Sequence, residues 1–142
     1  MLEKVIRLIA EQDICVLATV SDKTPHCSLM AYVASADGRR IHMATSRSTK
    51  KYSNILRNTS VSLLIDDRAA SERESASALT LTGTCAPMAE DEAKEQVRQM
   101  IIRRHPHLSK FVSHPDVDIL EMEVESVLLL QGLSESYFER LS

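Results

Sequence analysis

A run of hydroxyl and cationic side chains is the segment of this sequence best suited to bind an anion. In residues 45–51, Thr-Ser-Arg-Ser-Thr-Lys-Lys, four side chains carry a hydroxyl group and three carry a positive charge. The run leaves an expected strand and opens an expected helix, where free backbone N–H groups attract anions. Lysine and arginine strengthen such a site, and hydroxyls add neutral donors. This chemistry suits one phosphate monoester, although a solvated loop that caps a helix has the same composition.

The five histidines give no recognisable metal site. His105 and His107 lie two residues apart and His114 follows, but no acidic or sulfur ligand completes a set with metal-binding spacing. A polar surface turn explains these three residues better than a metal centre does. His26 and His42 lie on separate expected strands, where either one faces a ligand or is partly buried in the sheet.

Self-contained catalytic motifs are missing from the sequence. The three glycines lie far apart, which excludes a Rossmann fingerprint and a P-loop. An odd number of cysteines without CxxC spacing fits neither a disulfide framework nor a zinc site, so we expect Cys15, Cys27 and Cys85 to be small core residues. No nucleophile elbow is present. If the protein is an enzyme, we therefore expect a bound cofactor to supply the reactive atom.

Length and composition predict an ordinary globular protein. The chain has 142 residues, of which 44% are hydrophobic and 26% charged, as in one folded domain. A net charge of -3 argues against a general nucleic-acid binder. No run of 18 apolar residues predicts a membrane span, and residues 1–9 lack the apolar core of a signal peptide. We expect a cytoplasmic protein with a single domain over residues 1–142.

Hydrophobic periodicity predicts the elements that position these side chains. Helical spacing of apolar residues predicts helices over residues 2–12, 49–57 and 90–104. Apolar alternation and β-rich runs predict strands over residues 14–20, 26–34, 40–45, 60–65, 79–85 and 120–130, with a hairpin turn at Asp37-Gly38. The polar residues 67–77 indicate a mobile loop, and the tail 134–141 a short helix. This order predicts an α+β, mainly β domain with a six-stranded antiparallel barrel and peripheral helices.

Several segments, taken in order, resemble the pyridoxamine 5′-phosphate oxidase-like FMN-binding split barrels. The similar segments are residues 17–20, 25–32, 37–38, 45–51, 61–67 and 79–87. Residues 104–106 and 123–133 are similar to the haem-utilisation branch of the same superfamily. The resemblance implies a six-stranded split β-barrel that forms a homodimer and holds FMN at the subunit interface. A second subunit would also cover the apolar surface and strand edges of an open-sided barrel.

The resemblance also implies which residues bind the cofactor. Thr45 matches the family's threonine at the end of a strand, while Thr49, Lys50 and Lys51 match its phosphate clamp. Lys50 stands in place of an arginine, which keeps the charge and loses a bidentate fork. The remaining positions lie beside the phosphate (Ser46, Ser48), beside the flavin ring and ribityl chain (Ser28, Leu29, Met30, Tyr32), or near a later flavin contact (Ser77 or Ala78).

Departures from the family's enzymes limit the expected function. The Arg-rich strand and the C-terminal Arg-His pair of the vitamin B6 oxidases have no counterpart here, and residues 27–30 read Cys-Ser-Leu-Met. Haem-degrading relatives use a C-terminal histidine, but no histidine follows His114. We therefore expect an FMN-dependent oxidoreductase of unassigned substrate. The alternatives are a non-catalytic flavin-binding protein and a haem- or tetrapyrrole-binding split barrel that uses His26, His42 or a later histidine as ligand.

Overall fold

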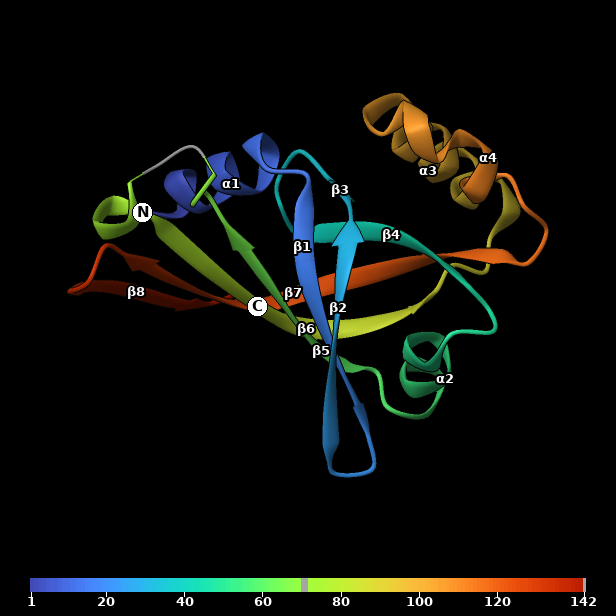
Figure 1. Ribbon diagram of the computed structural model, residues 1–142, viewed down its shortest axis with the longest axis horizontal. Helices are drawn as coiled ribbons and strands as arrows, with labels where there is room; N and C mark the ends of the chain where they lie inside the picture. Colours follow the sequence, from blue (N-terminus) through green and yellow to red (C-terminus); the bar gives the residue numbers. More distant parts are fainter. Residues whose placement is uncertain (70–71, 142) are drawn as a thin grey trace.

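The computed structural model describes residues 1–69 and 72–141 (Figure 1). Its helices are α1 (Leu2–Glu11), α2 (Lys50–Arg57), α3 (Asp91–Arg104) and α4 (Ser109–Val112), with 3-10 turns η1 (Arg73–Ser75) and η2 (Pro106–Leu108). Its strands are β1 (Ile14–Ser21), β2 (Thr24–Ala31), β3 (Val33–Ala34), β4 (Arg40–Ser46), β5 (Ser60–Asp66), β6 (Ser77–Pro87), β7 (Val117–Gln131) and β8 (Glu135–Arg140).

The strands form one curled antiparallel sheet in the order β2-β1-β5-β6-β7-β4-β3. The long strand β7 pairs with β6 along one edge. Its other edge is shared, because residues 117–123 pair with β4 and residues 126–131 pair with β8. Figure 1 shows the sheet curling, with the helices at its periphery. The predicted mainly β split barrel is confirmed, with more strands than the six expected.

Alternating side chains build the main core inside the curled sheet. Along β6, every second residue from Leu79 to Cys85 is buried, while the residues between them are only partly buried. Leu63 and Ile65 of the neighbouring β5 are fully buried in the same cluster. Burial of one such side chain stabilises the fold by about 1.5–3 kcal/mol. The period of two in the sequence therefore determines which face of each strand is covered.

A second, smaller core lies between α3 and the sheet. Val97 and Ile101 of α3 pack with Val112, Ile119 and Val33. The helix begins where Glu90 accepts hydrogen bonds from two backbone N–H groups of its first turn, and it ends in two arginines. Acidic residues at the start and basic residues at the end both favour the helix dipole. The predicted helix over residues 90–104 is confirmed, and α3 and α4 cover the start of β7.

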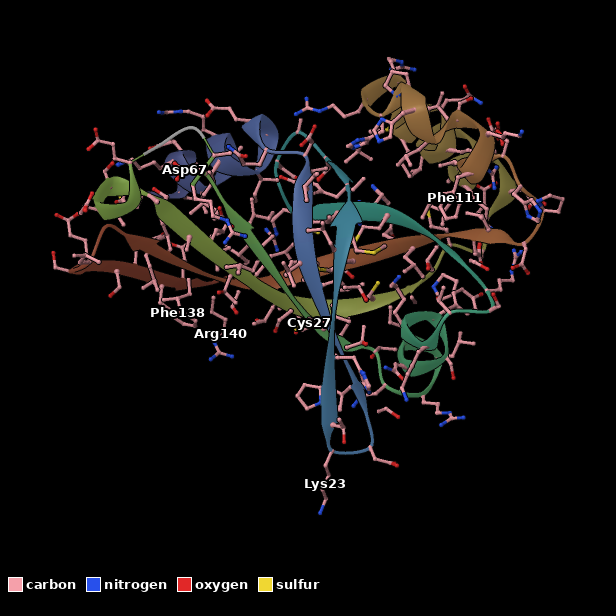
Figure 2. The ribbon with its side chains drawn as sticks, viewed as in Figure 1. Lys23, Cys27, Asp67, Phe111, Phe138 and Arg140 are labelled. Carbon is pink, nitrogen blue, oxygen red and sulfur yellow. The ribbon has the colours of Figure 1, made fainter. Side chains whose placement is uncertain are left out.

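Four of the expectations from the sequence need correction or completion. The tail is wrong as a helix, because residues 135–140 form β8 against the free edge of β7. Cys27 is wrong as a core residue, since it is exposed on the edge strand β2 (Figure 2). The strand expected over residues 26–34 is divided into β2 and β3. The expected mobile loop includes residues 70–71, which lie outside the described residues, while residues 73–75 form η1.

In the described part of the chain, no helix has the length and apolar character that crossing a membrane requires.

Candidate functional site

A groove with a volume of about 370 Å³ lies where the end of β4 and the start of α2 meet β2 and the helical segment after α3. We call it the β4–α2 groove. Its volume is within the range of small-molecule binding sites. It is lined by Leu29, Met30, Ala31, Ala44, Thr45, Ser46, Thr49, Lys51, Ile101, His107, Leu108 and Phe111.

The turn between β4 and α2 is fixed by the hydroxyl of Thr49. This hydroxyl accepts a hydrogen bond from the Tyr52 backbone N–H at 3.3 Å, which caps α2, and donates its own hydrogen to the Ser46 carbonyl at 2.8 Å. A hydroxyl has only one hydrogen. The Thr45 hydroxyl, 3.0 Å from that of Thr49, is therefore the donor of their pair. The cap fixes the start of α2, where the first backbone N–H groups have no partner within the helix, beside a groove that Thr49 and Lys51 line.

Two further contacts tie this turn to the residues before β7. The Ser46 hydroxyl donates to the Asp116 carboxylate at 2.5 Å and lies 2.9 Å from the Ser48 hydroxyl. The Arg47 guanidinium donates to the Pro115 carbonyl at 2.8 Å. The side chains of Ser46 and Arg47 are thus already engaged within the fold, and they hold the turn rather than extend from it.

The buried carboxylate of Asp118 lies beside the groove, because Asp118 pairs with Thr45 in the sheet. Only 4% of Asp118 is exposed, and it accepts hydrogen bonds from the Tyr52 hydroxyl at 2.7 Å and from the Ile119 backbone N–H at 2.9 Å. Lys94 pairs with it at 2.9 Å. Burial opposes the charge of Asp118, but the hydrogen bonds from Lys94, Tyr52 and Ile119 outweigh burial and lower the pKa of Asp118. The carboxylate therefore stays ionised and holds α2 and α3 against β7.

Six of the ten residues expected at the cofactor line the groove together. These are Leu29, Met30, Thr45, Ser46, Thr49 and Lys51. The other four do not line it: Ser28, Tyr32, Ser48 and Lys50. Neither Ser77 nor Ala78, at the start of β6, lines it either.

The four residues outside the groove are placed elsewhere by the strand register and the turn. Tyr32 follows the end of β2 and is 2% exposed, and its hydroxyl donates to the Ile9 carbonyl at 2.6 Å within the core. Ser28 pairs with Leu17 of β1. Ser48 contacts the hydroxyl of Ser46, and Lys50 points to solvent from the first turn of α2.

Sequence reasoning missed the wall formed after α3. His107, Leu108 and Phe111 line the groove from η2 and α4, and Ile101 lines it from α3. The side chain of Phe111 is 44% exposed, on the side of α4 that is turned towards α2 in Figure 2. The spacing of Leu108 and Phe111 by three residues is typical of a helix face, which was the available signal. The groove thus combines a polar, cationic end with an apolar wall.

The ionisable groups of the groove favour binding an anion over acid–base catalysis. Among the described lining residues, Lys51 and His107 are the only ionisable side chains. Within residues 1–69 and 72–141, no carboxylate lies within 4.0 Å of the Lys51 ammonium group. The positive charge of Lys51 is therefore available to an anion. The described residues contain no group of three or more His, Cys, Asp or Glu side chains suited to a metal ion.

The other histidines lie outside the groove. His42 is buried, with Nε2 2.9 Å from a carboxylate oxygen of Glu121 and Nδ1 without a partner in the described structure. His105 is buried with Nε2 3.0 Å from the Tyr32 carbonyl. His26 is half-buried on β2 and does not line the groove. Of the five histidines, all of which lie within the described residues, His107 is the one that lines the groove.

Comparison with known proteins gives one family and several structures of the same fold. A family model described as Pyridoxamine 5'-phosphate oxidase matches residues 1–131. No curated protein sequence matches the chain. A heme binding protein from Mycobacterium smegmatis has a TM-score of 0.85 at 17% identity, covering 99% of this chain and 58% of that chain.

Two further solved structures match this chain over most of the length of both proteins. A putative Pyridoxamine 5'-phosphate oxidase from Listeria innocua has a TM-score of 0.74 at 17% identity, covering 91% of this chain and 97% of that one. A FAD-binding protein from Mesorhizobium loti has a TM-score of 0.75 at 12% identity, with coverages of 89% and 91%. At these identities the likeness establishes the fold, and this chain spans 58% of the mycobacterial protein's length.

Proposed function

Because the chain belongs to the pyridoxamine 5′-phosphate oxidase family, we propose that it binds FMN in the β4–α2 groove and acts as a flavin-dependent oxidoreductase. The observation that carries this proposal is the polarity of the groove. The turn between β4 and α2 lines the groove with hydroxyl groups and Lys51, while β2, η2 and α4 line it mainly with apolar side chains. FMN has the matching polarity, with a phosphate at one end and a flat aromatic ring at the other.

The phosphate end of the groove fits a phosphate monoester. Lys51 lines it without a carboxylate partner among the described residues, and the N–H groups of Lys50 and Lys51 are the first of α2. A helix N-terminus with a nearby lysine is a favourable site for a phosphate group. Lys50 points to solvent, so we expect its charge to contribute through longer-range attraction.

The opposite end fits an aromatic ring. Met30, Leu108 and Phe111 line it, and Leu29 of β2 is 72% exposed there. An aromatic ring that stacks on Phe111 gains about 0.5–1.5 kcal/mol beyond the burial of its area. A ring seated on these residues would remove apolar surface from water.

The protein's own part in the reaction is positioning and exclusion of water. FMN, when bound, supplies the acceptor for a hydride or for single electrons. Lys51 holds the anionic end, and the apolar wall keeps water from the other end. Along that wall, His107 is the side chain whose ring nitrogens can form a hydrogen bond to the ligand.

We extend the proposal to a homodimer in the cytoplasm. Large apolar side chains remain exposed on several strands and their connections, among them Leu29, Leu133 at 88% exposure and Phe138. A second copy of the chain would cover such surface. Sedimentation at micromolar concentration tests the dimer directly.

The first test is an FMN titration followed by flavin fluorescence. We expect Lys51→Ala to weaken FMN binding by about one to two decades, because one charge-assisted phosphate contact contributes about 1.5–3 kcal/mol. Lys50→Ala is the matched control, since it removes the same charge from the neighbouring position outside the groove, and we expect a smaller loss. Absence of FMN binding by the unmodified protein would contradict the proposal.

Turnover separates an oxidoreductase from a non-catalytic flavin-binding protein. The FMN-loaded protein is mixed with NADH or NADPH and an electron acceptor, and its rate is compared with that of the same concentration of free FMN. A faster rate supports an oxidoreductase. A rate no higher than that of free FMN for every reductant tried leaves a protein that binds flavin without catalysis.

Haem is the second candidate ligand, because His107 lines the groove beside Leu108 and Phe111. The similarity of the fold to that of the mycobacterial heme binding protein also favours haem as a candidate ligand. If haem binds here, a Soret band should form at one equivalent of haem and should shift or vanish in His107→Ala. His26→Ala, outside the groove, is the control and should keep the spectrum. The same spectrum in both variants would exclude His107 as the ligand.

A further inference from the structure

A second cavity, of about 390 Å³, lies between the end of α1, strand β3 and the end of α3. We call it the α1–α3 cavity. Figure 1 shows α1 and α3 on either side of β3 and of the turn that follows it. The cavity has an apolar lining from Ile9, Val33 and Met100. Ala34 and Ala36 also line it, and their small side chains leave its space open. Its size is at the lower end of the range for small-molecule sites.

The α1–α3 cavity is separate from the β4–α2 groove. Met100 lines the cavity, while its neighbour Ile101 packs in the core and lines the groove. From the end of β2 into β3, Met30 and Ala31 line the groove, and the next residues Tyr32 and Val33 line the cavity. The C-terminal part of α3 and this stretch of strand therefore form a wall between the two spaces.

Two arginines of α3 give the cavity a cationic rim. Arg104 reaches the carbonyls at the end of α1 only at 3.4–3.5 Å, which leaves its guanidinium weakly bonded. Arg103 is exposed, and it forms no ion pair within the part of the chain that the structure describes. None of the described residues that line the cavity carries a carboxylate. The cavity lining thus carries two positive charges and no carboxylate of its own, and the nearby carboxylate of Asp37 is engaged with the Ser35 hydroxyl.

We propose that the α1–α3 cavity binds a small monocarboxylate with an apolar body. The apolar part would lie against Ile9, Val33 and Met100, and the carboxylate would reach the guanidinium of Arg103. Arginine recognises carboxylates through two parallel hydrogen bonds. Gln12 and Ser35 are the uncharged polar side chains of the lining besides the buried Tyr32, too few to bind a sugar or a nucleotide along its length.

Octanoate is the probe, and octan-1-ol is its uncharged counterpart. Calorimetric titration should show octanoate binding with millimolar or better affinity, and octan-1-ol binding at least tenfold more weakly because it lacks the charged contact. Backbone NMR should place the octanoate-induced shifts at residues 32–36 and 100–104. Shifts confined to residues 45–51 and 107–111 would place the ligand in the β4–α2 groove and overturn the proposal.

Two variants test the charge and the space separately. Arg103→Gln should weaken octanoate binding about tenfold or more while leaving octan-1-ol unchanged. Ala36→Phe, at an exposed position of the cavity rim, should block both probes without disturbing the core. Arg57→Gln removes an exposed charge that lines neither space and should change nothing. Equal loss in Arg57→Gln and Arg103→Gln, equal binding of both probes, or no binding of octanoate would each overturn the proposal.

Discussion

The hydroxyl of Tyr52 in α2 donates a 2.7 Å hydrogen bond to the carboxylate of Asp118 in β7, 66 positions along the chain. The other carboxylate oxygen is paired with Lys94 of α3 at 2.9 Å. One buried negative charge therefore joins two helices to β7, the neighbour of β4 in the sheet. A buried carboxylate is stable only with such partners.

We predict that Asp118→Asn lowers the free energy of unfolding at pH 7 by about 3 kcal/mol. The change leaves the mostly buried Lys94 ammonium without its partner, which is the costly way to break an ion pair. Urea unfolding measures the loss. Tyr52→Phe is the milder comparison and should cost about 1 kcal/mol, because it removes one hydrogen bond. A loss in Asp118→Asn no larger than that in Tyr52→Phe would contradict the role of the Lys94 pair.

The lowered pKa of Asp118 predicts an acid-sensitive contribution to stability. An unfolded aspartate titrates near 3.9, and the folded carboxyl titrates lower. The stabilisation is therefore fully present above about pH 4 and is lost as the pH falls through the folded pKa. Urea unfolding between pH 7 and pH 2.5 should show a smaller decline in Asp118→Asn than in the unmodified protein. Parallel declines would show that Asp118 is not the titrating group.

The cap of α2 predicts a stability loss at Thr49. Thr49→Ala removes the oxygen that accepts from the Tyr52 N–H, and an N-cap of this kind contributes about 1 kcal/mol. Thr49→Ser keeps an equivalent oxygen and should retain most of the stability. Thermal unfolding followed by circular dichroism compares the three proteins. If the alanine and serine variants were equally stable, the hydroxyl would not be the cap.

Gly83 sits at the irregularity in the pairing of β6 with β7, and we predict that it tolerates no side chain. A Cβ atom there would lie 1.9 Å from the Glu123 carbonyl oxygen, which is backbone and unable to move aside. Gly83→Ala should cost about 3 kcal/mol or more, or prevent folding, because the strands would have to separate. Ala86→Ser, at an exposed site of β6, should unfold like the unmodified protein in urea. Normal stability of Gly83→Ala would contradict the close approach.

Thiol reactivity should distinguish Cys27 from the other two cysteines. Burial raises the pKa of Cys15 and of Cys85 to about 12, so few thiolates form there at pH 8, while Cys27 is exposed. A disulfide reagent should modify one thiol per native chain and three after unfolding in guanidinium. Cys27→Ser should remove the native reaction. Three reactive thiols in the native protein would contradict the burial of Cys15 and Cys85, and none would place β2 against another chain.

The fold was predictable where the burial of one face of a helix or strand produces a regular pattern of apolar and polar residues in the sequence. The alternation from Leu79 to Cys85 defines β6, and the charge order of α3 marks both of its ends. The end of the chain was not predictable in this way. Residues 135–140 form a strand because β7 offers a free edge, and that edge is created by pairing between distant segments. Local spacing alone does not contain this information.

Prediction of the candidate site also succeeded for residues that are contiguous in sequence and failed for residues placed by tertiary packing. Thr45, Thr49 and Lys51 were predictable because one contiguous turn carries them. Tyr32 was placed at the cofactor by its sequence position, but the chain leaves β2 at Ala31 and the ring enters the core. Phe111 was missed because its place in the groove arises from the packing of α4 beside the sheet. The contiguous turn was found, and the family resemblance added Leu29 and Met30 of β2, but the part of the wall from α3 to α4 was not found.

The residues that line the groove come from segments far apart in the sequence, and this couples ligand binding to folding. Its turn and the segment before β7 are joined by Ser46 and Asp116, 70 positions apart, so a partly folded chain holds no complete binding surface. A ligand of the groove therefore binds the native state alone and, at one hundred times its dissociation constant, adds about 2.7 kcal/mol to the free energy of unfolding. Long-range pairings of this kind also make folding slow. A ligand that recognises only the finished groove lengthens the lifetime of the folded protein and leaves its rate of formation unchanged.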